Sequence, residues 1–410
     1  MSQLSVDGLA LSDEQRLVRR SVREICESFD RAYWRERDAS GEYPREFVDA
    51  LAENGWLGAL VPEEYGGAGM GTSEVVVMMD EIAAGGGGFS AAQAVHGGIY
   101  NSVPLVKYGS DEMKEALLPK VAAGEASIQA FGLTEPNAGS DSTSIETAAE
   151  RDGDEWVVNG QKIWTSRVDV SDYLVLVART TPKDDVEKKT RGISMFLVDL
   201  EAAYEQGGLE VEEIPKSASG FVHSFEMWFD DLRLPESALI GTEGEGFYQV
   251  LDGLNEERLV IAAECVGLGR LAIERGVAYA NEREVFGRPI GQNQAIQHPL
   301  AEAYARVQAA RQLTYDAADR ADGAAEGERG SDDARAAIGA RANVAKFLAA
   351  EACFAAADAA VQAHGGFGVA REYDVERYFR EARLTRLVPI TQQLALNYIG
   401  ERVLGMPRSY

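Results

Sequence analysis

The segment Phe131-Gly-Leu-Thr-Glu-Pro-Asn-Ala-Gly-Ser-Asp141 stands where helical periodicity has given way to short β-branched and aromatic runs. It follows an expected strand, and its hydroxyls and backbone N–H groups could hold the edge of a ring and a phosphate. A plain turn is the alternative, and local chemistry alone does not separate the two. Further along, Asn159-Gly-Gln-Lys-Ile-Trp-Thr-Ser166 places an indole and two hydroxyls near a strand end. Its Asn159-Gly160 pair predicts a hairpin turn.

The periodicity on either side of these segments divides the chain into three regions. Residues 1–125 are expected to form an N-terminal helical domain, residues 126–240 a middle β-barrel-like domain, and residues 241–410 a C-terminal four-helix domain. The polar segment from Gly323 to Asp333 predicts the bend of a helical hairpin. Helices, then strands, then long helices indicate an α+β fold and not an alternating βαβ sheet.

Local signals in the first region predict where its helices begin and end. Ser12-Asp-Glu-Gln15 has the pattern of a capping box. Pro44 is expected to start a second helix, and a third carries Val75 to Ile82. Four glycines, Gly85 to Gly88, then predict a break.

Several common cofactor sites are disfavoured by the sequence. The pattern G-x-G-x-x-G/A occurs only at Gly86-x-Gly88-x-x-Ala91 and Gly267-x-Gly269-x-x-Ala272, and neither follows an expected strand. These are predicted to be turn or helix-packing glycines, so a Rossmann site is disfavoured. No phosphate-binding G-x-x-x-x-G-K-[ST] loop and no G-x-S-x-G motif occurs. The four histidines are never paired at helical spacing, which argues against a zinc site.

The composition narrows the partners and the habitat. The chain of 410 residues carries 40 Lys and Arg against 67 Asp and Glu, a formal net charge of −27, with 45% hydrophobic residues. Nucleic acid and anionic membranes are poor partners for such a chain. Its three cysteines are scattered and are predicted to be small buried hydrophobes. With no apolar run long enough to span a bilayer, we expect a globular protein of a reducing, saline cytoplasm.

The two segments of the middle region resemble motifs of the acyl-CoA dehydrogenase family, T-E-P-x-A-G-S-D and N-G-x-K-x-W-x-[ST]. The resemblance extends to Pro62-Glu-Glu-Tyr-Gly-Gly67, to Arg283-Glu-Val-Phe-Gly287 with Gln294, and to Gln362-Ala-His-Gly-Gly366, in the order of the family. It implies a three-part flavoprotein, usually a homotetramer built as a pair of dimers, with FAD between the β domain and the helical bundle.

The resemblance also assigns cofactor-binding residues. Those expected on the flavin side are Phe131, Leu133, Thr134, Gly139, Ser140, Trp164, Thr165 and Ser166. Those expected to reach the pyrophosphate and adenosine of a neighbouring subunit's FAD, or to belong to the C-terminal part of the site, are Arg283, Phe286, Gln294, Gln362, Gly365, Gly366, Thr391 and Gln393. For Arg283, a solvated helix face is the alternative.

The family reaction desaturates an acyl-CoA thioester to the trans-2-enoyl-CoA. The α hydrogen leaves as a proton and a β hydrogen leaves as hydride to flavin N5, and the electrons pass to an electron-transfer flavoprotein. A carboxylate buried in a dry pocket suits the role of general base. Donors to the thioester oxygen stabilise the developing enolate.

The position of the base departs from the commonest family pattern. In most members a Glu follows the penultimate long helix, but here Pro389 occupies that position and offers neither a carboxylate nor an N–H. Isovaleryl-CoA dehydrogenase and its relatives place the Glu in L-x-x-E-R on a C-terminal-domain helix. Leu254-Asn-Glu-Glu-Arg258 matches that motif, so Glu257 is the predicted base. Two acids favoured by the dipole of a helix start are the alternative.

Substrate-side candidates surround the predicted base. They are Ser140, Ser142, Leu254, Asn255 and Arg258, and Arg258 is expected either to hold the pantetheine or diphosphate of CoA or to pair with a neighbouring carboxylate. Because CoA is anionic, we also expect Arg258, Arg283 and Arg167 to form a basic mouth, with activity rising as salt screens the acidic surface. Two other hypotheses stay open: an oxygen-reactive flavin oxidase or monooxygenase, and a non-catalytic scaffold.

Overall fold

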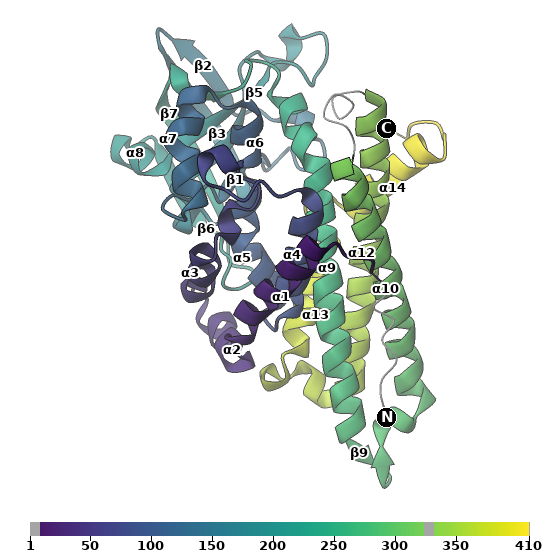
Figure 1. Ribbon diagram of the computed structural model, residues 1–410. Coiled ribbons are helices and arrows are strands. Elements are labelled where there is room, and N and C mark those ends of the chain that lie inside the picture. The colour runs from purple at the N-terminus through teal and green to yellow at the C-terminus, as the bar shows by residue number, and fades with distance from the viewer. Residues whose placement is uncertain (1–8, 324–331, 410) are drawn as a thin grey trace.

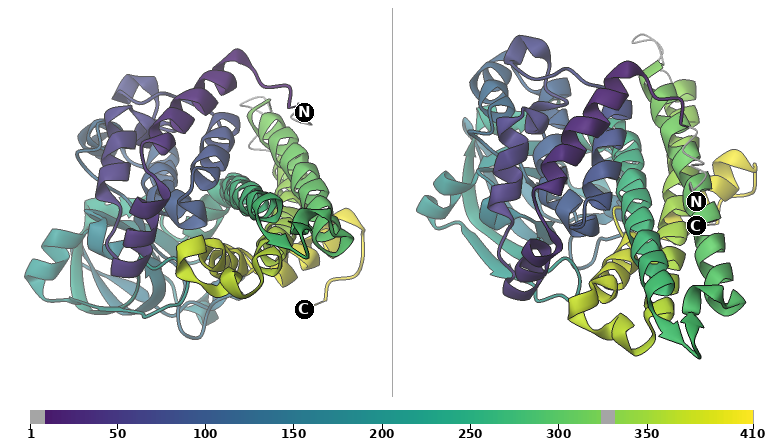
Figure 2. Two further views of the ribbon diagram at one scale, coloured as in Figure 1. Left: turned by 90° about the horizontal axis from the view of Figure 1, so that it is seen from below. Right: turned by 60° about the horizontal axis from the view of Figure 1, so that its bottom comes forward.

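The computed structural model describes residues 9–323 and 332–409, and it forms an α+β fold in three parts. N-terminal helices and a β-sheet lie on one side, and long helices of the C-terminal part lie on the other (Figures 1 and 2). The predicted fold class, with a β domain between two helical ones, is confirmed. The predicted bend falls on residues 324–331 and so lies outside the described residues.

The N-terminal part consists of α-helices that begin where the sequence supplies caps. Gln15 N–H donates to Ser12 Oγ at 3.0 Å and Ser12 N–H donates to Gln15 Oε1 at 3.1 Å, which confirms the capping box. Pro44 does precede a helix, but that helix is the third; α2 was missed because Trp34 is its only buried residue and leaves no apolar period. The helices are α1 (Asp13–Glu27), α2 (Arg31–Ser40), α3 (Arg45–Glu53), α4 (Thr72–Ala84), α5 (Gly88–Tyr100), α6 (Val103–Tyr108) and α7 (Asp111–Ala122).

The middle part is a mostly antiparallel sheet with the order β6-β7-β3-β2-β4-β5-β8, in which β1 pairs with β4 in parallel. Its strands are β1 (Ala130–Gly132), β2 (Ala148–Asp152), β3 (Glu155–Ser166), β4 (Tyr173–Arg179), β5 (Ile193–Asp199), β6 (Leu209–Glu213), β7 (Ser224–Pro235) and β8 (Leu239–Ile240). A short helix, α8 (Leu200–Gln206), follows β5.

The hairpin predicted at Asn159-Gly160 is wrong. Both residues lie inside the long strand β3, where the pairing with β7 shifts register between Val158 and Gly160. A Cβ on Gly160 would lie 2.6 Å from the Cα of Thr147, and its φ is +144°. The glycine therefore serves a β-bulge and a close approach to the neighbouring backbone. The β2–β3 hairpin turns instead between Asp152 and Glu155.

The C-terminal part is built on the long helix α9 (Gly246–Glu282), which lies between the N-terminal helices and the other long helices (Figure 1). It contacts α4 and α5 on one side and α10 (Gln294–Gly323) and α12 (Asp332–His364) on the other. Two short strands, β9 (Glu284–Val285) and β10 (Arg288–Pro289), join α9 to α10. The helices α13 (Val375–Thr385) and α14 (Gln392–Tyr398) complete this part.

Small residues let these helices approach closely. A Cβ on Gly267 of α9 would lie 2.3 Å from the carbonyl oxygen of Asp80 and 2.6 Å from Cβ of Ala83, both on α4. Gly86 and Gly88, with φ of +103° and +70°, form the turn between α4 and α5. Both G-x-G-x-x-A stretches are therefore structural, as predicted. Cys26, Cys265 and Cys353 are free and buried, which also confirms their prediction.

We expect Gly267→Ala to lower the free energy of unfolding by about 1–3 kcal/mol, because the added methyl group would overlap α4 backbone. The urea midpoint measures this change. Gly323→Ala is the control, since a Cβ there meets nothing within 4 Å. Equal midpoints for the two variants would contradict the close α4–α9 contact.

Candidate active site

A buried ion pair joins the two motif segments of the middle domain. Lys162 Nζ on β3 lies 2.7 Å from Oε1 of Glu135, which follows β1. The ammonium also donates to the carbonyl of Leu133 at 3.0 Å. Backbone N–H groups of Glu146 and Thr147 donate to the same Glu135 carboxylate. The acid and the base of the two motifs thus hold the segments together.

Burial and the charge of the partner act in opposite directions on the pKa of each residue of this pair. Desolvation lowers the pKa of Lys162 to about 8, although the Glu135 charge opposes that shift. Burial alone would raise the pKa of Glu135, but the Lys162 charge and several hydrogen bonds outweigh it and lower that pKa. Leaving one partner of such a pair unmatched costs about 3–5 kcal/mol. Sequence reasoning treated both motifs as ligand contacts and missed this structural role.

The ion pair leaves other residues of the motifs free to face a ligand. Phe131, Leu133 and Thr134 are half-buried and Gly139 and Ser140 are exposed. The indole of Trp164 is 54% exposed, on a backbone with φ of +63°. A Trp held in this way beside a polar loop presents an apolar face to a planar ring. Thr165 is buried, and its Oγ1 has no hydrogen-bond partner among the described residues.

The residues expected at the adenosine end lie elsewhere on the chain. Arg283 caps the C-terminus of α9 and is exposed, so both the cofactor role and the solvated helix-face alternative stay open. Phe286 follows in the β9–β10 turn and is 99% exposed, with φ of +55°. The other residues lie at helix ends. Gln294 is the first residue of α10, and Gln362 lies in the last turn of α12, which Gly365 and Gly366 follow. Thr391 is the N-cap of α14, and Gln393 lies in the first turn of that helix.

Within one chain, Arg283 and the β9–β10 turn lie far from the predicted base. Glu257 and Arg283 are separated by 26 residues of α9, or roughly 40 Å of helix axis, and β9 lies at the far end of the bundle (Figure 1). Phe286 is exposed, and Cβ atoms added to Gly365 and Gly366 would meet no described atom within 4 Å, so both segments present open surface.

Glu257 lies about three turns inside α9, so the dipole of the helix start does not account for it. Its side chain is 19% exposed, and its Oε1 lies 3.6 Å from Nε2 of His96 on α5. Its Oε2 is buried and has no hydrogen-bond partner among the described residues. One oxygen therefore faces a histidine, and the other is free to accept a proton.

His96 sits between two carboxylates of α9. Its Nδ1 lies 2.7 Å from Oε1 of Glu264, which is fully buried, and Gln93 Nε2 donates to the other Glu264 oxygen at 2.7 Å. Burial disfavours the charged ring, but Glu264 and Glu257 outweigh burial and raise the pKa of His96 to about 9. Sequence reasoning considered this histidine only as a metal ligand and so missed it.

Arg167, the residue after Ser166, extends this network to the middle domain. Its Nη1 donates to the carbonyl of Gln93 at 2.8 Å, and its guanidinium is buried. A Cβ on Gly97 would lie 2.7 Å from Nη2 of Arg167, so α5 needs a glycine there. Arg167 is thus a link between β3 and α5, and its predicted place in an exposed basic mouth is wrong.

A lysine of α12, Lys346, forms hydrogen bonds with the segment that follows Pro389. Lys346 Nζ donates to the carbonyl of Ile390 at 2.7 Å and to Gln392 Oε1 at 3.1 Å. Desolvation lowers the pKa of Lys346 to about 8. Val388, Pro389 and Ile390 bring apolar side chains and no carboxylate to this position.

The substrate-side candidates divide between α9 and the loop after β1. Leu254 packs against the same buried apolar cluster as Phe131 and Leu133, which places α9 beside the motif surface. Arg258 Nη1 donates to Asn255 Oδ1 at 2.7 Å, and desolvation lowers the pKa of Arg258. Ser142 begins a short turn directly after Ser140 and Asp141.

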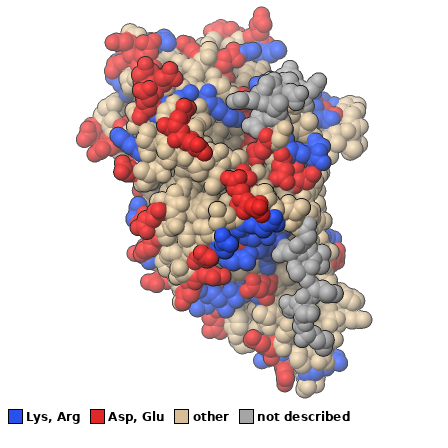
Figure 3. Space-filling model, viewed as in Figure 1, with Lys and Arg blue, Asp and Glu red and all other residues tan. Residues whose placement is uncertain are grey.

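The three arginines expected at a basic mouth do not meet within one chain. Arg167 is buried, Arg258 is bound to Asn255, and Arg283 lies at the other end of α9. On the face drawn in Figure 3, Asp and Glu are widely spread, and Lys and Arg gather near α1.

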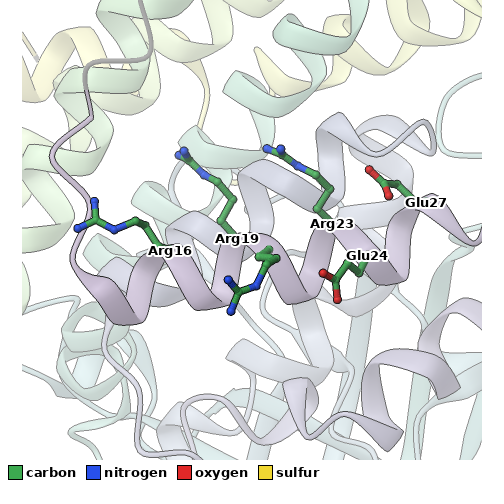
Figure 4. A pocket seen from close by; sticks show the side chains of 6 residues that line it. Arg16, Arg19, Arg23, Glu24 and Glu27 are labelled. Carbon is green, nitrogen blue, oxygen red and sulfur yellow. The ribbon is translucent and has the colours of Figure 1, made fainter.

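The α1 arginines line a separate depression. It has a volume of about 250 Å³ and is lined by Arg16, Arg19, Arg20, Arg23, Glu24 and Glu27. Arg19 and Arg23 extend side by side from α1 (Figure 4), and both pair with Glu81 of α4. These arginines therefore belong to the contact between α1 and α4 and not to the surroundings of Glu257.

Comparison with known proteins identifies the family. Three family models match: the acyl-CoA dehydrogenase N-terminal domain at residues 12–125, the middle domain at 130–232 and the C-terminal domain at 244–404. The acyl-CoA dehydrogenase FadE12 of Mycobacterium tuberculosis is 36% identical over 405 residues, which cover 97% of this chain and 98% of that protein. This chain belongs to the acyl-CoA dehydrogenase family and is an oxidoreductase acting on CH–CH donors.

Solved structures agree with this assignment. A glutaryl-CoA dehydrogenase in complex with glutaryl-CoA has a TM-score of 0.86 at 30% identity, covering 98% of each chain. A chain from a structure of the electron transferring flavoprotein of Acidaminococcus fermentans has a TM-score of 0.86 at 29% identity, covering 97% of this chain and 99% of that one. Within the described residues, no helix is both long and apolar enough to cross a membrane.

FAD is the cofactor of this family, and the residues present fit it. An exposed indole, a half-buried Thr134 and the open backbone at Gly139 and Ser140 form a surface suited to a planar ring with polar edges. When bound, FAD supplies the hydride acceptor.

We expect folding stability to reveal the charge on His96. Because the folded state raises the pKa of His96 from 6.5 to about 9, its contribution is full below 6.5 and is lost as pH rises through about 9. Urea midpoints should therefore differ most between wild type and His96→Gln below pH 6.5, and the gap should narrow above pH 9. A gap independent of pH would show that His96 is not charged in the folded protein.

Proposed function

We propose that this chain catalyses the FAD-dependent α,β-dehydrogenation of an acyl-CoA thioester to the trans-2-enoyl-CoA, with Glu257 as the base. The observation that carries the proposal is the free, buried Oε2 of Glu257 on a helix that packs beside the motif surface. The alternative position for a base is occupied by Pro389. This placement is the one found in isovaleryl-CoA dehydrogenase.

In this proposal, each of the site residues has a separate role. Trp164 and Thr134 orient the flavin, and Leu254 holds the acyl group against it. Glu257 Oε2 would take the α proton, and FAD, when bound, would supply the hydride acceptor for the β hydrogen. With no N–H at Pro389, the Ile390 amide would be the backbone donor of this segment to the thioester oxygen.

The open surface at the far end of α9 supports an oligomer. We infer a homotetramer, a dimer of dimers, in which Arg283, Phe286, Gln294, Gln362, Gly365 and Gly366 bind the FAD of a neighbouring subunit. The exposed Phe286 favours burial against another surface. The three domains divide at residues 125/126 and 240/241.

Electron acceptor and compartment complete the proposal. The likeness to a chain from an electron transferring flavoprotein structure supports that protein as acceptor. Three free, buried cysteines are consistent with a reducing cytoplasm, and the net charge of −27 favours a saline one. A flavin oxidase or monooxygenase is the second candidate, because Pro389 alters the usual site; prompt reoxidation of the reduced enzyme by air with peroxide release would favour it.

We expect Glu257→Gln to slow anaerobic flavin reduction by acyl-CoA about 10²–10⁴-fold, since the amide cannot accept the α proton. Stopped-flow bleaching of the flavin, with a panel of acyl-CoA esters, measures the rate. Glu256→Gln is the matched control, because it removes the neighbouring carboxylate and should reduce its flavin at a rate close to wild type. A yellow Glu257→Gln protein that is reduced as fast as wild type would overturn the assignment.

We expect turnover to rise with added NaCl before levelling off. The anionic CoA must approach an acidic surface, and salt shortens the range of that repulsion to about 10 Å at 0.1 M. Steady-state rates from low to molar NaCl test this. A steady decline over the whole range would count against a saline habitat.

A further inference from the structure

We propose that His96 is a positioning residue for Glu257: held by Glu264, it fixes Oε1 of Glu257, so that Oε2 faces the α proton. The inference rests on the proposed function, in which Glu257 is the base. It adds a residue of the N-terminal domain to a site otherwise built from the other two.

The geometry of the ring carries the first step. Glu264 Oε1 lies 2.7 Å from Nδ1 of His96, and Glu257 Oε1 lies 3.6 Å from Nε2. The ring nitrogens thus face one carboxylate each: Nδ1 is within hydrogen-bond distance of Glu264, and Nε2 lies at ion-pair distance from Glu257, an arrangement that favours the imidazolium. Because only Oε1 of Glu257 faces the ring, the contact also sets the rotation of the carboxylate.

The burial of Glu264 carries the second step. This carboxylate is fully buried, and a buried charge is stable only when it is paired and hydrogen-bonded. Gln93 Nε2 satisfies one of its oxygens, and His96 supplies the positive charge at the other. Glu264 therefore favours the charged form of His96, and the raised pKa of His96, about 9, agrees with it.

The remaining groups around the ring do not reverse this balance. From α5 itself, Tyr100 lies 6.0 Å from the His96 ring, centroid to centroid. From the middle domain, the Arg167 cation is attracted to both Glu264 and Glu257. Helices α4 and α13 also pack on α5, but Asp80 and Glu81 of α4 pair with Arg270 on α9, and Glu381 and Arg377 of α13 bind near Ser90 and Gly87.

A charged His96 affects the base in two opposite ways: it stabilises the carboxylate before the reaction, and that stabilisation is lost when the carboxylate accepts the proton. A cation beside a carboxylate favours the charged form of that carboxylate. When Glu257 takes the α proton, its ion pair with His96 is lost, so the cation does not accelerate the proton transfer itself.

The test is the pH profile of anaerobic flavin reduction at saturating acyl-CoA. In wild type, we expect the rate to fall on the acidic side as Glu257 becomes protonated. In His96→Gln, the midpoint of that fall should move up by about one pH unit or more, because the cation that faces Oε1 is gone while Arg167 and Arg258 are unchanged. An unmoved midpoint in a folded, yellow variant would overturn the inference, even if the rate at every pH were lower.

Two further proteins separate this role from a structural one. His223→Gln is the matched control, because His223 Nδ1 also lies 2.7 Å from a carboxylate, that of Asp169, away from Glu257; its midpoint should equal that of wild type. Glu264→Gln should move the midpoint in the same direction as His96→Gln, because His96 loses the charge that favours its protonation. A shift in the His223 variant, or none in the Glu264 variant, would contradict the inference.

A direct measurement needs no variant at the site. In wild-type protein labelled with ¹⁵N-histidine, His96 should give an imidazolium signal at pH 7 and lose it only near pH 9. A neutral His96 at pH 7 would overturn the inference, whatever the variants do. Failure of the proposed function is a different result: Glu257→Gln would then reduce its flavin at the wild-type rate, while the His96 signal stayed as described.

Discussion

The carboxylate of Glu264, fully buried in the longest helix of the protein, sets the constraint on which the site depends. A charge in that position requires a partner, and the partners come from α5, which must therefore lie against α9 at the level of His96 and Gln93. The same contact brings His96 to Glu257, two turns earlier on α9. The contact that packs α5 against α9 therefore also positions the predicted base, Glu257.

A second buried ion pair performs the corresponding task in the middle domain. Glu135 and Lys162 hold the loop after β1 against β3, and this leaves Trp164 at the surface. Arg167, three residues after that Trp, reaches back to Gln93. Arg167 therefore connects β3 to α5, and Gln93 and His96 connect α5 to Glu264 and Glu257 on α9. Rigid support of this kind holds reacting groups in place.

The sequence allowed the fold class and the motif surface to be predicted, because both depend on local patterns. Periodicity separated helices from strands, and the family motifs marked Thr134, Trp164 and Glu257. The turn at Asn159-Gly160 was predicted wrongly because a glycine needed for a bulge looks the same as one needed for a hairpin. His96, Glu264 and Arg167 were missed or misplaced for another reason. Their partners are between 38 and 168 residues away, and no local spacing reveals such contacts.

The central claim is that Glu257, supported from α5, removes the α proton. A crystal structure of the protein with FAD and a non-reacting acyl-CoA thioether analogue tests it most directly. The account predicts that Glu257 Oε2 lies about 3–3.5 Å from the α carbon, on the opposite side of the acyl chain from flavin N5, with Oε1 still facing His96. A different carboxylate at the α carbon, or Glu257 turned away from it in the complex, would contradict the account.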